Sequence, residues 1–440
     1  MTLSVFKNTQ FLFVALLLFT CFSCESQTKK NAEVISKEKK VLNKDKQENR
    51  KETKETKEDR TKIVLGADRM EEYLPLLQNK KVGVVANQTS MVQLNSEAHF
   101  ENGVNEKIEL QLHLVDYLKN QEVNIQKVFS PEHGFRGKAD AGEVVKDGID
   151  TKTGLPIVSL YGKNKKPSKE QLAGIDLMVF DIQDVGVRFY TYISTMHYMM
   201  EACAENNIPF VVLDRPNPNG HYIDGPVLEM KYKSFVGMHP VPVVHGMTIG
   251  EYAQMINGQK WLKNGVTCDL TVIKMKNYTH QTPYSLPIKP SPNLPNDVSI
   301  NLYPSLCFFE STKISIGRGT EMQFQIFGAP NLAVEEFPFT FTPQANEGAK
   351  KPKFKGQLCY GKDLRNTKKL DKLNLEWLIE AYVANGKKDD FFSSFFTKLA
   401  GTATLKKQIE QGLSYREIRK TWLKDLEDYD KMRQAYLLYE

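Results

Sequence analysis

The chain has 440 residues, of which 41% are hydrophobic, and a formal net charge of +6. This length allows two or three domains and a sizeable buried core. About five of the six excess positive charges lie in residues 1–62. The nearly neutral remainder argues against a nucleic-acid-binding surface and against nucleic acid as a partner.

The N-terminus has the pattern of an export signal. Lys7 precedes an apolar run at 11–19 that is too short to span a bilayer. The following TCFSCE (20–25) resembles the lipobox of a bacterial lipoprotein, with Cys24 as the lipidated residue and Cys21 as the second choice. Phe22 departs from that pattern, and an ordinary cleaved signal peptide is the alternative. We therefore expect residues 1–24 to be a lipoprotein-type signal peptide. The protein would then be exported and lipid-anchored to a membrane, in the periplasm or at the cell surface.

A charged segment follows. Residues 25–62 are almost all Lys, Glu, Thr, Asn and Gln, and they include no aromatic residue. Such a composition buries too little apolar surface to offset the entropy lost on ordering. We expect a disordered tether that connects the anchor to a folded body, which begins near Ile63.

Strands and helices alternate in the next part of the chain. The stretch 175–220 predicts a βαβ unit, because apolar runs at 177–180 and 208–213 flank apolar residues at helical spacing from Phe189 to Cys203. The other predicted elements are helices at 71–77, around 110–119 and at 248–261, and strands at 81–86, 123–129, 156–160 and 268–273. This alternation predicts an α/β fold, with a doubly wound, mostly parallel sheet over residues 63–285.

The character of the sequence changes after Tyr284, where four prolines lie within nine residues. The predicted elements beyond them are strands at 312–316, 323–327 and 337–341, and helices at 375–384, 391–399, 405–411 and 415–429. We expect residues 286–440 to form a smaller C-terminal α+β domain.

Carboxylates follow two of the predicted strands, and open α/β sheets bind ligands at the carboxyl ends of their strands. Glu132 lies between Pro131 and His133 and is the best single candidate for a general acid or base. The alternative is a turn residue. Asp181 and Asp184 follow the fourth strand, where two carboxylates in one cleft would suit acid and base roles. Either could instead cap the next helix.

Arginines near predicted loops are candidate clamps for a substrate carboxylate, although most arginines lie on solvated surfaces. They are Arg136, Arg188, Arg215 and Arg318. Tyr161, Tyr190 and Tyr192 could stack on a sugar, although tyrosines at such spacing more often belong to the core. The histidines and cysteines show no metal-binding spacing, and no nucleotide-binding or serine-hydrolase motif is found. We therefore expect neither a metal nor a cofactor. An exported esterase or amidase is a further alternative, but the sequence contains no motif for its nucleophile.

Ten stretches, taken together and in order, resemble one family. They are VGVVANQTS (82–90), VFSPEHGFRG (128–137), ADAGE (139–143), TGLPIVSLYG (153–162), VFDIQDVGVRFYTY (179–192), VLDRPNPNG (212–220), HGMTIGEYA (245–253), PSPNLP (290–295), YPSLCFFE (303–310) and GRGT (317–320). The chain resembles the NamZ-type exo-β-N-acetylmuramidases from about residue 64 to its end. It departs from the family pattern at Gln323 and Phe324, where a basic residue and a proline are commoner, and this bears on substrate selection.

The resemblance implies a Rossmann-like domain joined to a smaller C-terminal domain, with a cleft between them. It also implies release of terminal β-linked N-acetylmuramic acid from peptidoglycan fragments, with Glu132 as the leading catalytic residue. Asp181 and Asp184 remain the other catalytic candidates because of their positions after a predicted strand. The expected substrate-binding residues are Asn87, His133, Arg136, Arg188, Tyr190, Asp214, Arg215, Asn217 and Arg318.

The chemistry of this sugar adds two expectations. Its lactyl carboxylate requires a cation, for which Arg188 and Arg215 are the first candidates. Its 2-acetamido group can act as an internal nucleophile, so retention, inversion and substrate assistance all stay open. The rival interpretation is a non-catalytic, lipid-anchored glycan-binding protein.

Overall fold

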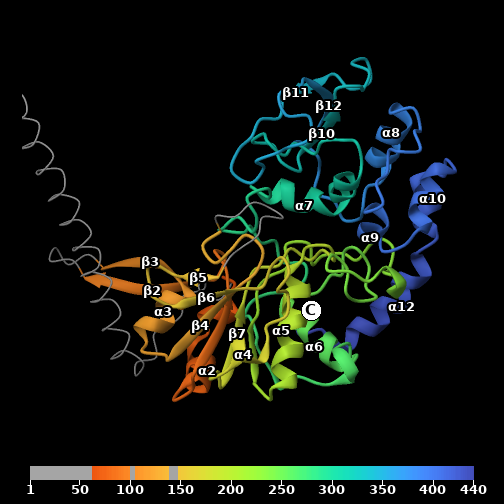
Figure 1. The fold of residues 1–440 in the computed structure, drawn as a ribbon. Helices are drawn as coiled ribbons and strands as arrows, with labels where there is room; N and C mark the ends of the chain where they lie inside the picture. Colours follow the sequence, from red (N-terminus) through yellow and green to blue (C-terminus); the bar gives the residue numbers. More distant parts are fainter. Residues whose placement is uncertain (1–61, 100–104, 138–146) are drawn as a thin grey trace, which may run out of the picture. The chain divides into compact units, whose positions relative to one another are not determined.

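The computed structural model describes residues 62–99, 105–137 and 147–440 (Figure 1). The predicted signal peptide, Cys24 and nearly all of the predicted tether lie outside the described residues. The chain divides into two compact units. The second unit comprises residues 61–94 and 110–440 and contains both the main sheet and the site.

A seven-stranded sheet forms the centre of the first domain, with the strand order β5-β6-β4-β1-β7-β8-β9. Its strands are β1 (Val82–Ala86), β4 (Ile125–Ser130), β5 (Gly148–Ile149), β6 (Pro156–Ser159), β7 (Leu177–Asp181), β8 (Phe210–Leu213) and β9 (Leu270–Ile273). Neighbouring strands are parallel, except that the short edge strand β5 is antiparallel to β6. The six parallel strands therefore follow the order 3-2-1-4-5-6 that is typical of Rossmann folds. The predicted α/β fold is confirmed.

Five helices accompany this sheet: α2 (Met70–Leu77), α3 (Leu114–Asn120), α4 (Lys169–Leu172), α5 (Tyr192–Glu205) and α6 (Ile249–Gly258). Helix α6 begins as predicted, because Thr248 and Glu251 form a reciprocal capping box. Helix α5 begins three residues later than the apolar spacing predicts. Phe189 lies before it and packs edge-on against Tyr303 and Phe308 of the C-terminal domain.

Two strands that the sequence analysis missed, β2 (Met91–His99) and β3 (Asn105–His113), pair as a separate two-stranded sheet. Residues 110–113, expected to begin a helix, belong instead to β3. The polar residues in both strands weakened the apolar signal there.

The C-terminal domain combines helices with a small antiparallel sheet of order β10-β12-β11. Its elements are α7 (Asp297–Leu306), β10 (Ile326–Ala329), β11 (Phe339–Phe341), β12 (Cys359–Asp363), α8 (Glu376–Ala384), α9 (Phe396–Ala400), α10 (Thr404–Glu410), α11 (Tyr415–Lys420) and α12 (Leu423–Arg433). One hydrophobic cluster extends from the parallel sheet into this domain. The predicted boundary near residue 285 stays a prediction.

Two expectations in the C-terminal domain were wrong, and one helix was missed. Residues 312–316 form only isolated bridges instead of a strand. The single helix expected at 415–429 is two helices, interrupted at Trp422, whose indole Nε1 donates a hydrogen bond to Asp224 at 3.1 Å. Helix α7 was missed because it contains Pro304 and buries polar residues such as Ser299.

Arg188 connects the two domains through buried hydrogen bonds. Its side chain is fully buried, with Nη1 donating to the carbonyls of Pro226 and Val241 at 2.7 and 2.8 Å. Nη2 donates to the carbonyls of Leu399 and Ala400, the last residues of α9, at 2.9 and 2.8 Å. A cation is favourable at a helix C-terminus, and burial lowers the pKa of Arg188 to about 9. This arginine is engaged by the fold and is not available to a substrate.

We predict that Arg188→Met lowers the free energy of unfolding by about 3 kcal/mol or more. The change removes the arginine donor from the buried carbonyls of Pro226, Leu399 and Ala400, and each costs about 1–3 kcal/mol if it stays unpaired; the Val241 carbonyl still accepts from the Leu228 amide. Chemical denaturation measures the loss. Arg365→Met, which removes an exposed partner of Asp363, is the control and should leave the midpoint unchanged. A wild-type midpoint for Arg188→Met would contradict this role.

Candidate active site

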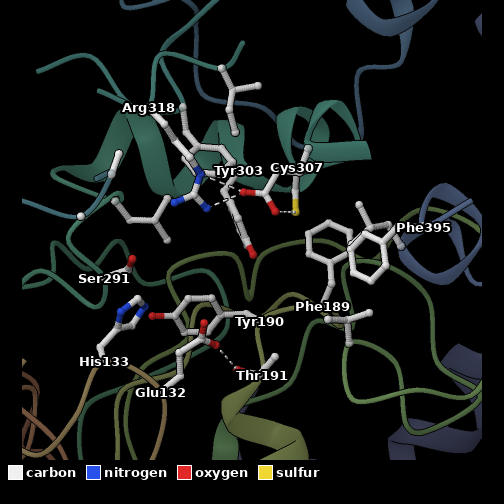
Figure 2. A pocket seen from close by; sticks show the side chains of 18 of the residues that line it. Glu132, His133, Phe189, Tyr190, Thr191, Ser291, Tyr303, Cys307, Arg318 and Phe395 are labelled. Atoms are coloured by element: carbon white, nitrogen blue, oxygen red, sulfur yellow. Dashed lines mark hydrogen bonds and ion pairs between the residues drawn. The ribbon is translucent and has the colours of Figure 1, made fainter. Parts of the chain in front are cut away.

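A cavity of about 1130 Å³ lies between side chains of the two domains (Figure 2). It is larger than the roughly 300–1,000 Å³ typical of pockets that enclose a drug-sized ligand. Its polar and aromatic lining includes Glu132, His133, Tyr161, Lys165, Tyr190, Thr191 and Phe235 from the first domain, and Ser291, Tyr303, Cys307, Glu310, Arg318, Phe324, Lys350, Lys351, Lys353, Phe395 and Lys398 from the second. The cavity can therefore hold a ligand larger than one sugar ring.

Glu132 enters this cavity from the carboxyl end of β4. The chain turns sharply after it, because His133 and Gly134 both adopt left-handed backbone conformations with φ of 71° and 79°. Tyr161 Oη donates to Glu132 Oε1 at 2.9 Å, and Thr191 Oγ1 donates to Oε2 at 2.9 Å. Both carboxyl oxygens are thus oriented by hydroxyl groups from other segments.

The two hydroxyl donors lie at the ends of regular elements of the first domain. Tyr161 follows β6, the neighbour of β4, and Thr191 immediately precedes α5. Burial and the neighbouring Glu132 carboxylate raise the pKa of Tyr161, so this phenol keeps its proton and acts as a donor. Sequence reasoning considered Tyr161 only as a stacking residue and missed Thr191, although both lie in the quoted motifs.

The C-terminal domain places an ion pair on the other side of the cavity. Arg318 Nε donates to Glu310 Oε1 at 3.0 Å, and Nη2 donates to the same oxygen. The guanidinium lies 5.3 Å from the centre of the Phe324 ring. Figure 2 shows Arg318 and Tyr303 on one side, and Glu132 and His133 on the other. Sequence reasoning selected Arg318 but missed its partner Glu310.

The charged groups that line the cavity are mostly cations. Six of them, Lys165, Arg318, Lys350, Lys351, Lys353 and Lys398, accompany two carboxylates, Glu132 and Glu310, within the part of the chain that the structure describes. Such a lining favours an anionic ligand.

Asp181 and Arg215 form a buried ion pair outside this cavity. Arg215 Nε and Nη2 donate to the two carboxyl oxygens of Asp181 at 2.5 and 2.9 Å. Asp181 has no exposed surface, and Nη2 of Arg215 also donates to the carbonyl of Met91 at 2.9 Å. Asp181 ends β7 next to β1, where a Rossmann sheet reverses its strand order and commonly binds its ligand. The ion pair occupies that position, so neither residue reaches the cavity.

The other two predicted aspartates support the local fold. Asp184 accepts a hydrogen bond from the Gly186 amide at 2.7 Å, and burial raises the pKa of Asp184 to about 7. Asp214 accepts from the Gly250 amide at the start of α6 at 2.8 Å, and burial likewise raises the pKa of Asp214 to about 7. Neither side chain lines the cavity.

Three more predicted substrate ligands have structural partners instead. Asn87 Oδ1 accepts from the Thr89 amide at 2.9 Å, and Asn217 Oδ1 accepts from the Asn219 amide at 2.8 Å. Arg136 forms ion pairs with Asp116 and Asp150 at 3.1 and 2.8 Å. Of the twelve predicted catalytic and substrate-binding residues, the structure brings four to the cavity: Glu132, His133, Tyr190 and Arg318.

Comparison with protein families gives two matches that together cover most of the chain. The model of the N-terminal domain of the exo-β-N-acetylmuramidase NamZ matches residues 82–298, and that of the NamZ C-terminal domain matches residues 301–439. The chain belongs to the NamZ exo-β-N-acetylmuramidase family. Glu132 thus lies in the N-terminal NamZ domain, and Glu310 and Arg318 lie in the C-terminal one.

Individual relatives agree with the NamZ assignment. A protein described as peptidoglycan β-N-acetylmuramidase NamZ, from Bacillus subtilis strain 168, is 38% identical over 404 residues, covering 86% of this chain and 92% of that protein. Two solved structures are of DUF1343 family proteins from Bacteroides fragilis. One is 46% identical with a TM-score of 0.76, covering 86% of this chain and 99% of that chain. The other is 31% identical with a TM-score of 0.70, covering 87% and 100%.

Two features are absent from the part of the chain that the structure describes. No helix there is both long and apolar enough to cross a membrane. No group of three or more His, Cys, Asp or Glu side chains there has the arrangement needed to hold a metal ion.

We predict that Asp184 makes folding stability depend on pH. Because its folded pKa is raised from 3.8 to about 7, the folded state binds the proton more tightly than the unfolded state. The stabilisation that Asp184 contributes to the folded state is therefore fully present below pH 4. It is lost as the pH rises to 7, and the loss in the free energy of unfolding is about 4 kcal/mol at most. Asp184→Asn removes this loss. The measurement is the free energy of unfolding of both proteins from pH 4 to 8.

The stability difference between wild type and Asp184→Asn should change across this range and level off above pH 7. Asp389→Asn, at an exposed position, is the control and should give a constant difference. A constant difference for Asp184→Asn as well would exclude the proposed titration.

Proposed function

We propose that this protein is an exo-acting glycoside hydrolase that releases terminal β-linked N-acetylmuramic acid from peptidoglycan fragments. The observation that carries the proposal is the position of Glu132, which lies in the family's EHGFRG motif and enters a cavity between the NamZ domains. The relative from Bacillus subtilis is described as a peptidoglycan β-N-acetylmuramidase. Membership of an enzyme family favours this function over the alternative of a non-catalytic glycan-binding protein.

Glu132 acts as the general acid in this proposal. Tyr161 and Thr191 hold its two oxygens, so the carboxyl group is presented to the glycosidic oxygen in a fixed orientation. The proton passes to that oxygen as its bond to the anomeric carbon breaks, and the remaining glycan leaves as an alcohol. A positioned acid of this kind typically contributes about 10²–10⁴-fold to the rate.

The second catalytic group differs from the expectation of paired carboxylates. Asp181 and Asp184 lie outside the cavity. Glu310, the other carboxylate in the described part of the lining, is engaged by Arg318. This favours the substrate's 2-acetamido oxygen as the nucleophile at the anomeric carbon, a known exception among glycosidases. Water then opens the resulting oxazoline ring and returns a proton to Glu132, so the sugar is released with retained configuration.

We predict that Glu132→Gln lowers kcat on a MurNAc-GlcNAc disaccharide by about 10²–10⁴-fold. Glutamine keeps the shape and hydrogen bonding of the side chain but cannot donate a catalytic proton. A nitrophenyl N-acetylmuramide needs less protonation, because its leaving group is good, and should lose less activity. The measurement is kcat for both substrates, with folding checked by thermal melting.

Glu335→Gln, at an exposed position, is the control and should retain full activity. Near wild-type turnover of the disaccharide by folded Glu132→Gln would rule out the acid role. Equal losses on both substrates would also rule it out and would indicate that Glu132 only positions the sugar.

We also propose that the protein is exported and attached to a membrane by a lipid on Cys24, with residues 25–62 as a charged tether. The apolar run at 11–19 and the following cysteine support this proposal. The attachment would place the enzyme close to cell-wall fragments.

We predict that Cys24→Ala moves the protein from the membrane fraction to the soluble fraction, because the lipid attachment point is lost. Cys21→Ala is the matched control and should leave the protein in the membrane fraction. The measurement is the distribution of the full-length protein between salt-washed membranes and supernatant. Membrane retention of Cys24→Ala would refute the proposal.

A further inference from the structure

The chemistry of N-acetylmuramic acid raises a question that the catalytic residue does not answer. This sugar differs from N-acetylglucosamine by a lactyl ether that ends in a carboxylate, so selection between the two requires a group that binds that carboxylate. The two arginines first expected in this role are engaged elsewhere: Arg188 holds four carbonyls, and Arg215 is paired with Asp181. The cavity must supply another cation.

Arg318 presents an unused edge to the cavity. Its Nε and Nη2 donate to one oxygen of Glu310, which is a side-on contact. Its Nη1 makes no hydrogen bond to any residue in the described part of the chain, and Arg318 lines the cavity with about a quarter of its side chain exposed. A guanidinium has five N–H donors in a rigid plane, so the end-on edge formed by Nη1 and Nη2 remains able to bind a carboxylate in a bidentate manner.

The backbone around Arg318 is fixed. Gly317 and Gly319 both have left-handed conformations, with φ of 78° and 84°. A Cβ atom at Gly317 would lie 2.7 Å from the Met322 carbonyl oxygen, and one at Gly319 would lie 2.5 Å from the Gln344 carbonyl oxygen. The GRGT motif therefore holds the arginine in a tight turn that admits only glycine on either side.

The backbone conformation of Phe324 is a second, independent indication that this region binds a ligand. Its φ is 53°, an unusual backbone conformation for a bulky aromatic residue. Its buried ring packs against Tyr303 with centroids 4.9 Å apart and lies beside the Arg318 guanidinium. Strained residues of this kind concentrate at ligand-binding sites. Phe324 is also one of the two positions at which this chain departs from the common family pattern.

The charged groups next to Arg318 carry a net charge that one anion can neutralise. The ammonium group of Lys353 donates to the carbonyls of Phe309 and Glu310, which places a second cation beside the ion pair. Arg318 and Lys353 together with Glu310 carry one net positive charge, and a single carboxylate neutralises it. Lys353 also donates to the carbonyls of Thr312 and Ile314, so four hydrogen bonds hold its ammonium group in place.

We propose that Arg318 binds the lactyl carboxylate of N-acetylmuramic acid through its Nη1–Nη2 edge and is the residue that selects this sugar over N-acetylglucosamine. The inference rests on the proposed function, because that function defines the ligand. It assigns recognition of the acid group to the C-terminal domain, whereas proton transfer belongs to Glu132 in the N-terminal domain.

Equilibrium binding of free sugars tests the proposal without requiring turnover. The probes are N-acetylmuramic acid, its methyl ester and N-acetylglucosamine. They are titrated calorimetrically into the wild-type protein and into Arg318→Met, Arg318→Lys and Arg365→Met, the last at an exposed position that does not line the cavity. A charge-assisted bidentate contact contributes about 1.5–3 kcal/mol, or roughly 10- to 150-fold in Kd. Wild type should prefer the acid to both neutral sugars by this factor.

Arg318→Met should abolish the preference and leave N-acetylglucosamine binding unchanged, and Arg318→Lys should retain only part of it. Arg365→Met, the matched control outside the cavity, should behave as wild type. The ester is the decisive probe, because it should bind wild type and Arg318→Met equally. Arg318→Lys keeps a charge beside Glu310, so it provides the test if Arg318→Met fails to fold. A preference that survives in folded Arg318→Lys at full strength, or that disappears in Arg365→Met, would overturn the proposal.

The outcomes separate this inference from the proposed function. Arg318-dependent preference for the acid, in a protein that cleaves no N-acetylmuramide, would support the recognition site and contradict the hydrolase. Cleavage of N-acetylmuramides with a preference that is independent of Arg318 would support the hydrolase and overturn the recognition site.

Discussion

The cavity depends on one buried cation that contacts no substrate. The side chain of Arg188 extends from the segment before α5 to the C-terminal domain, where it donates hydrogen bonds to the last two carbonyls of α9. Its Nη1 and Nη2 donors are matched by carbonyl oxygens and not by a carboxylate, so its charge is stabilised by dipoles. Phe395 and Lys398, which line the cavity, lie on or next to α9. The position of this wall over the carboxyl edge of the parallel sheet therefore follows from the Arg188 contacts.

Much of the fold could be predicted from the sequence, and the reason is the regular burial of the parallel strands. All five residues of β1 and of β7 are buried, so their sequences are continuous apolar runs that are easy to recognise. The hairpin β2–β3 and helix α7 lack this signal, because their sequences mix polar and apolar residues or include proline. The start of α5 was predicted three residues too early for a different reason. Phe189 precedes the helix, and its apolar ring contacts the other domain.

The site was harder to predict, because the sequence shows which residues are polar but not which of them the fold itself requires. Asp181, Asp214 and Arg215 follow strand ends as ligand-binding residues commonly do, yet each forms buried contacts that hold loops and the start of α6. Glu132 follows a strand in the same way, but it lines the cavity, and hydroxyl groups of Tyr161 and Thr191 hold its carboxyl oxygens. The difference lies in partners that are distant in sequence, and no local pattern encodes it.

The separation of Glu132 and Arg318 onto two domains has an evolutionary consequence. The segment that contains Arg318, Gly317 and Gly319 contacts other parts of the C-terminal domain, such as Gln344, Pro352 and Phe324. Changes in this segment can alter the charge and shape of one wall while the hydroxyl contacts of Glu132 stay intact. Related proteins could therefore come to prefer different acidic or neutral sugars through substitutions in the C-terminal half alone. For directed evolution of sugar preference, this segment is a compact region to mutate first.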